Sequence, residues 1–427
     1  IRYNEDTKLL YCIFEGEELV MVEINSMPLV SVILPVYLGE DYIRETIRCI
    51  LSQTYTKIEL LVIDDGSPDK SGSIADEAAS LDARLTVFHQ PHRGVSAARN
   101  VGLEHARGDY ICFIDCDDHV YGDMIRMMVM AMEKKHADMS IFNVFDENER
   151  GLGGLLGWHI KSRDIPSDMI KARLFLGLDP QVWRKVYRAH LWENVRFPED
   201  VLYEDLYVNS EVLLNAKKLI ATDQVLYDNN HYNEKSVSAL EKEPRILYEL
   251  KAWMHNLNLA RKIPVLSAYR EYYRWQALRC WAKCNGTLGE DMFQGNSAIY
   301  DVLFTALPLA DAIRPAPQSD RNTLLYYMAE VEAMTLAITM LKQCGLECHH
   351  EVRDMFQAAV PALCIDNVLH ILHPSSRELL LCAIEEARRY KRRLNFGQRF
   401  MMGMIGKGPK DVLELKGRQY LKRGISK

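Results

Sequence analysis

Apolar runs of five to seven residues recur along the first half of the chain, and segments with helical spacing separate them. Such near-continuous runs are typical of strands buried on both faces of a parallel sheet. The expected strands are 30–36, 58–63, 85–89, 110–114 and 138–144, and the expected helices are 41–53, 74–83, 95–106 and 122–135. This alternation predicts an open, Rossmann-like α/β fold, with a mostly parallel sheet and helices on both faces.

The pattern changes on either side of this region. Two short apolar runs, 9–14 and 19–24, flank an acidic Gly-containing turn and predict a hairpin, and 219–227 is the expected last strand. Beyond about residue 240, Leu and aromatic residues recur at helical spacing and strand signals end. We therefore expect an N-terminal extension over 1–28, an α/β domain over 29–240 and a mainly α-helical domain over 241–427.

Polar motifs follow three of the expected strands. Tyr37, Asp64 and Asp115 each come at the carboxyl end of a strand, and in open parallel sheets ligands bind at that edge. Asp115 and Asp117 are two residues apart in extended chain, so their carboxylates project to the same side. Paired carboxylate oxygens suit Mg²⁺ or Mn²⁺, and such a cation suits a diphosphate ligand.

Two further motifs lie at expected helix starts. Gly94 precedes the helix over 95–106, which places Arg99 about one turn into the helix, where we expect it to face a phosphate oxygen. Glu204 and Asp205 begin a later helix, where the helix dipole is expected to keep Asp205 ionised. Taken alone, acids at a helix start indicate capping, and Asp-Asp-Gly-Ser at 64–67 indicates an ordinary turn.

The composition adds limits on the class of protein. With 48% hydrophobic and 26% charged residues among 427, the chain is typical of soluble globular proteins. The most apolar stretch, 324–341, contains Glu330 and Glu332, so we do not expect an integral membrane protein. No cationic, apolar leader opens the chain, and ten cysteines in a long chain indicate reduced thiols in a cytoplasmic setting.

Cysteine spacing leaves one alternative open. Two cysteine pairs have spacings that could bind zinc: Cys280 with Cys284, and Cys344 with Cys348 beside His349 and His350. Neither pair has a second matched pair nearby in a recognised zinc pattern, so the sequence favours buried thiols at these positions.

Charge is unevenly distributed. Residues 388–427 hold thirteen Lys and Arg against Asp411 and Glu414, a balance of +11, which leaves −18 for the remainder of a chain with a net charge of −7. An acidic body argues against nucleic acid as a partner. The basic tail also contains an apolar cluster, 396–405, and this combination suits an anionic membrane surface, with packing on its own domain as the alternative.

The order of the motifs resembles glycosyltransferase family 2, whose catalytic domain has the GT-A fold. The matching segments are Leu-Pro-Val-Tyr at 34–37, Asp-Asp-Gly-Ser at 64–67, Gly-Val-Ser-Ala-Ala-Arg-Asn-Val-Gly-Leu at 94–103, Gly-Asp-Tyr at 108–110 with Phe-Ile-Asp-Cys-Asp-Asp at 113–118, Lys-Val-Tyr at 185–187 and Glu-Asp at 204–205. The resemblance covers about residues 29–240 and leaves the C-terminal half unassigned.

This resemblance implies a site for transferring a sugar from a nucleotide-diphosphate donor, such as a UDP-sugar, to an acceptor hydroxyl with inversion. It implies Asp205 as the catalytic base and Asp115 and Asp117 as the DxD-like metal ligands for Mn²⁺ or Mg²⁺. His231 is a candidate third metal ligand, with a structural role as the alternative. The implied donor-binding residues are Pro35, Val36, Tyr37, Asp64, Ser67, Gly94, Arg99, Asp115 and Cys116.

The acceptor class follows from the same resemblance. A glycan or lipid-linked acceptor in bacterial surface glycan or glycolipid synthesis would place the protein in the cytoplasm, peripherally on the inner membrane face, and an oligomer is compatible with the sequence. Two rival functions stay open. One is a non-catalytic sugar-nucleotide-binding or scaffold protein, and the other is a nucleotidyltransferase, which would release pyrophosphate.

Overall fold

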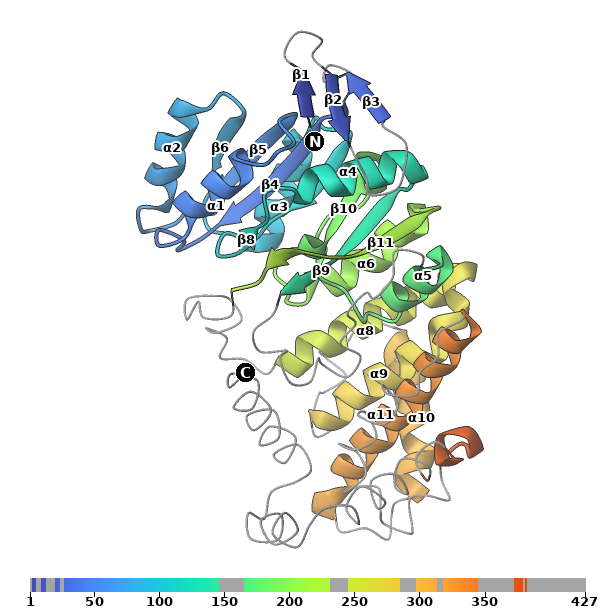
Figure 1. Ribbon diagram of the computed structural model, residues 1–427. Coiled ribbons are helices and arrows are strands. Elements are labelled where there is room, and N and C mark those ends of the chain that lie inside the picture. Colours follow the sequence, from blue (N-terminus) through green and yellow to red (C-terminus); the bar gives the residue numbers. More distant parts are fainter. Residues whose placement is uncertain are drawn as a thin grey trace, which may run out of the picture.

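The structure is a computed structural model of the 427-residue chain, and it describes residues 2–4, 9–12, 20–23, 27–145, 165–230, 245–284, 297–312, 318–344, 372–378 and 381. An α/β part containing a large sheet lies next to a helical part (Figure 1). A separate small sheet of β1 (Arg2–Asn4), β2 (Leu9–Cys12) and β3 (Val20–Glu23) stands at the N-terminus. Strands β2 and β3 pair antiparallel, which confirms the predicted hairpin.

The large sheet has the strand order β6-β5-β4-β7-β10-β9-β11-β8. Strands β4, β5, β6 and β7 are parallel neighbours, whereas β10 runs antiparallel to both β7 and β9, and β8 runs antiparallel to β11. The sheet is therefore mixed: four of the predicted strands form a parallel half, and the predicted strands β9 and β11 lie in the other half. The strands are β4 (Val30–Val36), β5 (Ile58–Asp64), β6 (Leu85–His89), β7 (Tyr110–Phe113), β8 (His119–Val120), β9 (Met139–Phe145), β10 (Lys185–Arg188) and β11 (Leu219–Asp228).

Helices cover both faces of the sheet, as predicted. Alternate residues of β4 divide between two hydrophobic clusters: Val32 and Leu34 pack on the side of α1 (Ile43–Leu51) and α4 (Met124–Lys135). Ile33 packs on the opposite side with residues of α3 (Val95–His105) and α6 (Glu204–Asn215). Two further helices of this part are α2 (Ser71–Leu81) and α5 (Ser167–Phe175). Apolar residues at successive β positions therefore serve two cores.

The helical part shares one of these cores. Its helices are α8 (Arg245–Lys262), α9 (Arg270–Lys283), α10 (Ala298–Ala312) and α11 (Gln318–Gln343). The cluster that contains Ile33 continues through α5 and α6 to Leu257 in α8 and Leu341 in α11. The hydroxyls of Tyr272 and Tyr273 in α9 donate hydrogen bonds of 2.9 Å to carbonyls at the end of α5. The domain boundary predicted near 240 lies outside the described residues.

One long helix bears on the expected relation to membranes. Within the part of the chain that the structure describes, the segment Arg321–Gln343 is long and apolar enough to cross a bilayer, judged by length and composition. Of its most apolar stretch, 71% is buried against the rest of the protein, as in a core helix. Its Glu332 carboxylate accepts hydrogen bonds from the Ser376 hydroxyl and the His373 backbone N–H.

Candidate functional site

The loops after three adjacent parallel strands meet at one edge of the sheet. Strand β4 lies between β5 and β7, so the segments that follow Val36, Asp64 and Phe113 emerge together. Backbone hydrogen bonds continue past the strand ends: the Asp65 N–H donates to the Val36 carbonyl at 2.9 Å, and the Ile114 N–H donates to the Ile33 carbonyl at 3.1 Å. The order of strands thus brings the predicted motifs to a common edge.

Asp65 organises the loop that leads into α3. Its carboxylate accepts hydrogen bonds from the backbone N–H groups of Arg93 at 2.9 Å and Gly94 at 2.8 Å, and His92 Nδ1 lies 2.8 Å away. Gly94 has a φ of +88°, a conformation that favours glycine directly before the helix. The His92 ring stacks on Tyr37 with centroids 4.0 Å apart. Sequence reasoning assigned no role to Asp65, although it is the second acid of the Asp-Asp-Gly-Ser motif.

Asp64 is buried and held from two sides. Its Oδ1 accepts the Ser67 backbone N–H at 3.0 Å, and its Oδ2 lies 2.9 Å from His89 Nδ1. The hydrogen bond to Asp64, followed by that to Asp76, raises the pKa of His89 above its usual value. Of the other predicted donor residues at this edge, Pro35 and Val36 are buried in β4.

The acidic turn after β7 is fixed by its last carboxylate. Asp118 accepts hydrogen bonds from the Tyr227 hydroxyl at 2.7 Å and the Asn230 N–H at 2.8 Å, and the Asp115 N–H donates to the same hydroxyl. Burial, followed by the negative charge of Asp115, raises the pKa of Asp118 to about 8. The turn is therefore attached to the end of β11, a role for Asp118 that sequence reasoning did not assign.

Cys116 and Asp117 occupy the middle of this turn. The Cys116 sulfur packs against Gly39, where an added Cβ would lie 2.6 Å from it. Glycine at position 39 therefore gives the thiol its place beside the first helix of the domain. Asp117 is partly exposed next to it.

Arg99 joins the acidic turn to the start of α6. Its side chain is 4% exposed, and its terminal nitrogens lie 3.0 Å from Asp115, 2.7 Å from Glu204 and 3.4 Å from Asp205. Burial opposes the charge of Arg99, but the three carboxylates together raise its pKa. Both terminal nitrogens are thus engaged by acids, partners that the sequence did not indicate. A donor-binding role for Arg99 remains a prediction.

Asp205 lies in the same cluster and does not cap its own helix. The N-cap of α6 is Tyr203, which has a positive φ of 61°, and no side chain caps this helix. Asp205 Oδ2 instead accepts the Val182 backbone N–H at 3.2 Å. Burial, with the charges of Glu204 and Asp115, raises the pKa of Asp205 to about 7 against the opposing effect of Arg99. Desolvation thus opposes the effect expected from the helix dipole, and the ionised state of Asp205 stays a prediction.

A buried ionic cluster supports the segment that contacts Asp205. Asp179 pairs with Arg173 at 3.1 Å and with Arg184 at 2.9 Å, and all three side chains are largely buried. Lys185 Nζ donates hydrogen bonds of 2.6 Å to the Asp179 and Gln181 carbonyls. Burial lowers the pKa of Lys185 despite the nearby acids. These contacts fix the 3-10 turn Val182–Arg184 beneath Asp205. In the sequence, the Lys-Val-Tyr motif at 185–187 marks this segment, because Lys185 is its first residue.

The structure brings most of the predicted residues to one region. The loops that contain Tyr37, Asp64, Gly94 and the acidic turn share one edge, and Arg99 connects that turn with Asp205. His231, the candidate third metal ligand, lies outside the described residues, as do Cys348, His349, His350 and the basic tail. Cys280 is buried in α9, and Cys284 follows the end of this helix. Burial is the main cause that raises the pKa of each thiol.

Comparisons with known proteins give the family and several relatives of this chain. The model of the family described as "Glycosyl transferase family 2" matches residues 31–182. Glycosyltransferase GlyA of Streptococcus pneumoniae serotype 4 is 34% identical over 209 residues, which cover 46% of this chain and 30% of GlyA. The uncharacterized glycosyltransferase EpsJ of Bacillus subtilis is 34% identical over 208 residues, covering 47% of this chain and 60% of EpsJ. The chain therefore spans less than two thirds of these two relatives.

Another relative is matched over most of its length. The uncharacterized glycosyltransferase YibD of Escherichia coli K12 is 31% identical over 285 residues, which cover 60% of this chain and 79% of YibD. Among solved structures, S. aureus TarS residues 1–349 in complex with UDP-GlcNAc has a TM-score of 0.51 at 22% identity, covering 74% of this chain and 90% of the TarS chain. The TarS likeness concerns the fold, which is GT-A with a helical C-terminal region. The family match and the identity to YibD show that the chain belongs to glycosyl transferase family 2.

Proposed function

We propose that the protein transfers a sugar from a nucleotide-diphosphate donor to an acceptor hydroxyl with inversion at the anomeric carbon. The observation that carries this proposal is the Arg99 bridge, which holds Asp115 of the donor-side turn and Asp205 of α6 on one guanidinium. In this reaction the bond between the anomeric carbon and the diphosphate oxygen breaks as the acceptor oxygen attacks from the opposite face. The acceptor proton passes to Asp205.

Asp205 has the chemistry that a general base needs. A base is most effective when its pKa lies near the working pH, and the pKa of Asp205 is raised to about 7. The Val182 N–H and Arg99 fix its two carboxylate oxygens, so the side chain is oriented before an acceptor arrives.

The acidic turn fits a divalent cation. Asp115 and Asp117 offer the oxygen donors that Mn²⁺ and Mg²⁺ prefer. The negative charges of Asp115 and Asp117 both contribute to the raised pKa of Asp118, so the turn carries an excess of negative charge that a cation would relieve. When bound, such a cation would offset the charge that develops on the departing diphosphate. We propose a UDP-sugar as the donor, since TarS, which has a similar fold, was crystallised with UDP-GlcNAc.

Two isosteric variants test these assignments with UDP-sugars and Mn²⁺. Asp205→Asn should lower the rate of transfer by about 10²- to 10⁴-fold, because it removes the base. Donor affinity should be unchanged, because Arg99 keeps its ion pair with Asp115 of the acidic turn. Asp117→Asn should weaken donor binding itself. Asp168→Asn, on the exposed start of α5, is the control and should match the parent protein. Normal turnover in both site variants would refute the roles of Asp205 and Asp117. Release of pyrophosphate would indicate a nucleotidyltransferase. Donor binding without transfer by the parent protein would indicate a binding protein.

We also propose that the acceptor is a glycan or a lipid-linked glycan, used in bacterial surface glycan or glycolipid synthesis. The basic tail over 388–427 would then hold the enzyme on an anionic membrane surface, on the cytoplasmic side. Deletion of residues 388–427 should abolish co-sedimentation with phosphatidylserine-containing vesicles while leaving transfer to a soluble acceptor intact. Unchanged vesicle binding by the truncated chain would contradict the role of the tail.

A further inference from the structure

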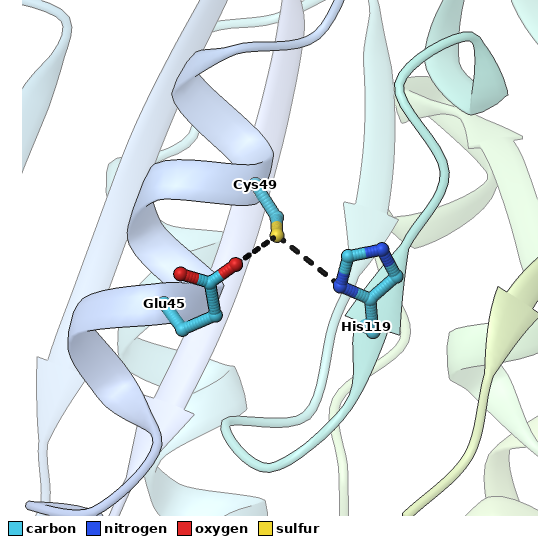
Figure 2. Close-up of side chains that lie close together, drawn as sticks. All are labelled: Glu45, Cys49 and His119. Carbon is cyan, nitrogen blue, oxygen red and sulfur yellow. Dashed lines mark hydrogen bonds between the residues drawn. The ribbon is translucent and has the colours of Figure 1, made fainter.

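Three side chains of different chemistry meet beside the acidic turn, on α1 and β8 (Figure 2). Cys49 Sγ lies 3.4 Å from Glu45 Oε1 and 3.3 Å from His119 Nδ1. Glu45 and Cys49 are four residues apart on α1, so they occupy the same helix face. Cys49 is 6% exposed, whereas Glu45 and His119 are exposed, so the sulfur is reached through the cluster.

We propose that Glu45, Cys49 and His119 form a binding site for a zinc-class divalent cation, with a water molecule as the fourth ligand. Metal bonds of about 2.0–2.3 Å in a tetrahedron separate neighbouring ligand atoms by roughly 3.5 Å. The two distances from the sulfur are within a few tenths of that value, and all three ligand atoms lie within 4.8 Å of one another. Small side-chain movements would therefore complete the geometry.

The donor set selects the kind of cation. A thiolate and an imidazole with one carboxylate suit Zn²⁺, whereas Mg²⁺ and Mn²⁺ prefer oxygen ligands. Binding forms a metal–sulfur bond and releases the thiol proton of Cys49 to solvent, with no oxidation or reduction. Arg48 also contacts Glu45, and its Nε lies 2.8 Å from Oε2. A second Arg48 nitrogen, Nη2, contacts Oε1, the oxygen beside the sulfur, so the cation would have to displace it. Because both side chains are more than half exposed, moving Arg48 costs little.

The position of the cluster indicates what the cation would do. His119 directly follows the acidic turn, and the neighbouring Thr46 hydroxyl of α1 already donates a 2.6 Å hydrogen bond to the Cys116 carbonyl within that turn. A cation held by two side chains of α1 and by His119 would connect the same two segments a second time. It would therefore stabilise the segment that contains Asp115 and Asp117 without being one of their ligands. This inference does not depend on the proposed function.

Cobalt, added to the full chain after treatment with a chelator, and zinc, added afterwards to the cobalt-loaded protein, test this site. Co²⁺ should produce the charge-transfer absorption of a cobalt–thiolate bond, which a cation bound by the oxygen ligands Asp115 and Asp117 cannot produce. Zn²⁺ should displace the cobalt and remove this absorption. Cys49→Ala should abolish the band, and Cys284→Ala, a cysteine on the distant α9 end, should retain it.

Two exposed ligands keep the test decisive if Cys49→Ala fails to fold. His119→Gln and Glu45→Gln should each weaken Zn²⁺ binding in competition with a chromophoric chelator. For His119→Gln the loss should exceed about 100-fold, since even outer-shell partners contribute about 10- to 100-fold. His105→Gln, at the end of α3, should bind like the parent protein. No cobalt–thiolate band in the parent, an unchanged band in Cys49→Ala, or parental affinity in either ligand variant would overturn the site and leave a hydrogen-bonded trio.

Discussion

At the residue scale, Arg99 is the cation that links the acids of the described site. Its buried guanidinium neutralises acids from two segments, at Asp115 and Glu204, that are 89 residues apart in sequence. A buried cation of this kind costs desolvation free energy, and the three carboxylates repay it. The sequence identified Arg99 but not its acidic partners, because the spacing from Gly94 carries no information about the distant Glu204.

Removal of the Arg99 charge should destabilise the protein. Arg99→Met is expected to lower the free energy of unfolding by about 3–5 kcal/mol, because three carboxylates lose their counter-charge. The matched control is Arg44→Met, whose ion pair with Glu77 is mostly exposed, so its loss should change stability little. Urea unfolding of both variants measures the difference. Equal losses would mean that the Arg99 cluster is not a significant source of stability.

The raised pKa of His89 gives a prediction about pH. The protonated ring is favoured in the folded state by Asp64 and Asp76, so its stabilising effect is complete below the unfolded pKa of about 6.5. That effect is lost as pH rises through the folded pKa. His89→Gln should therefore lower the melting temperature at pH 5.5 and have little effect at pH 9. A difference that grows with pH would contradict this sign.

At the element scale, close packing of α3 on β4 positions Arg99. Gly102 lies against Ile33, and a Cβ at this position would clash with that side chain, whose Cγ1 would be 3.0 Å away. The absence of a side chain lets the helix approach the sheet closely enough for the Arg99 guanidinium to reach Asp115. Packing of this kind is not visible in a hydrophobic pattern, which treats a small residue as neutral.

Enlarging Gly102 should therefore affect stability and activity together. Gly102→Ala is expected to cost about 1–3 kcal/mol of unfolding free energy, the usual range for overpacking, and to lower transfer as α3 shifts. Gly122→Ala is the control, because a Cβ there meets nothing within 4 Å. Guanidinium unfolding and a transfer assay measure both effects. A Gly102→Ala protein as stable as Gly122→Ala would show that the helix adjusts without strain.

The accuracy of the predicted elements follows their length and periodicity. Strands β4 and β6 have the predicted bounds, and other long elements of the α/β part differ by a few residues at their ends. The sequence did not predict β8, β10 or α5. Strands β8 and β10 have only two and four residues, which is too short for a recognisable apolar run, and both pair antiparallel with their neighbours. Their place in the sheet depends on residues far along the chain.

At the scale of the whole molecule, one hydrophobic cluster extends from the sheet into the C-terminal helices. The predicted division into 29–240 and 241–427 remains a prediction, and the shared core has a consequence for cooperativity. Side chains that reach across, such as Trp253 of α8, pack against α9 and beside the positive-φ turn at Gly177. A domain that needs its neighbour to bury apolar surface should not unfold independently.

The described parts should thus unfold in one transition. Far-UV circular dichroism and tryptophan fluorescence are expected to give coincident urea curves. Tyr273→Phe removes a buried hydrogen bond from α9 to the Phe175 carbonyl and should lower the unfolding free energy by about 1 kcal/mol for both probes. Tyr300→Phe, on an exposed position of α10, is the control. Two separated transitions, with only one of them shifted, would instead support independent domains.

The sequence by itself determined the elements and motifs whose signal is local. Apolar runs gave the parallel strands, helical spacing gave the helices, and Asp64, Asp115 and Asp117 followed from their places after strands. The tertiary structure decided what depends on distant neighbours: the Arg99 partners, the raised pKa of Asp205, and the trio of Glu45, Cys49 and His119. The physical reason is that desolvation and ion pairing depend on which segments the fold brings together, and local periodicity carries no information about that.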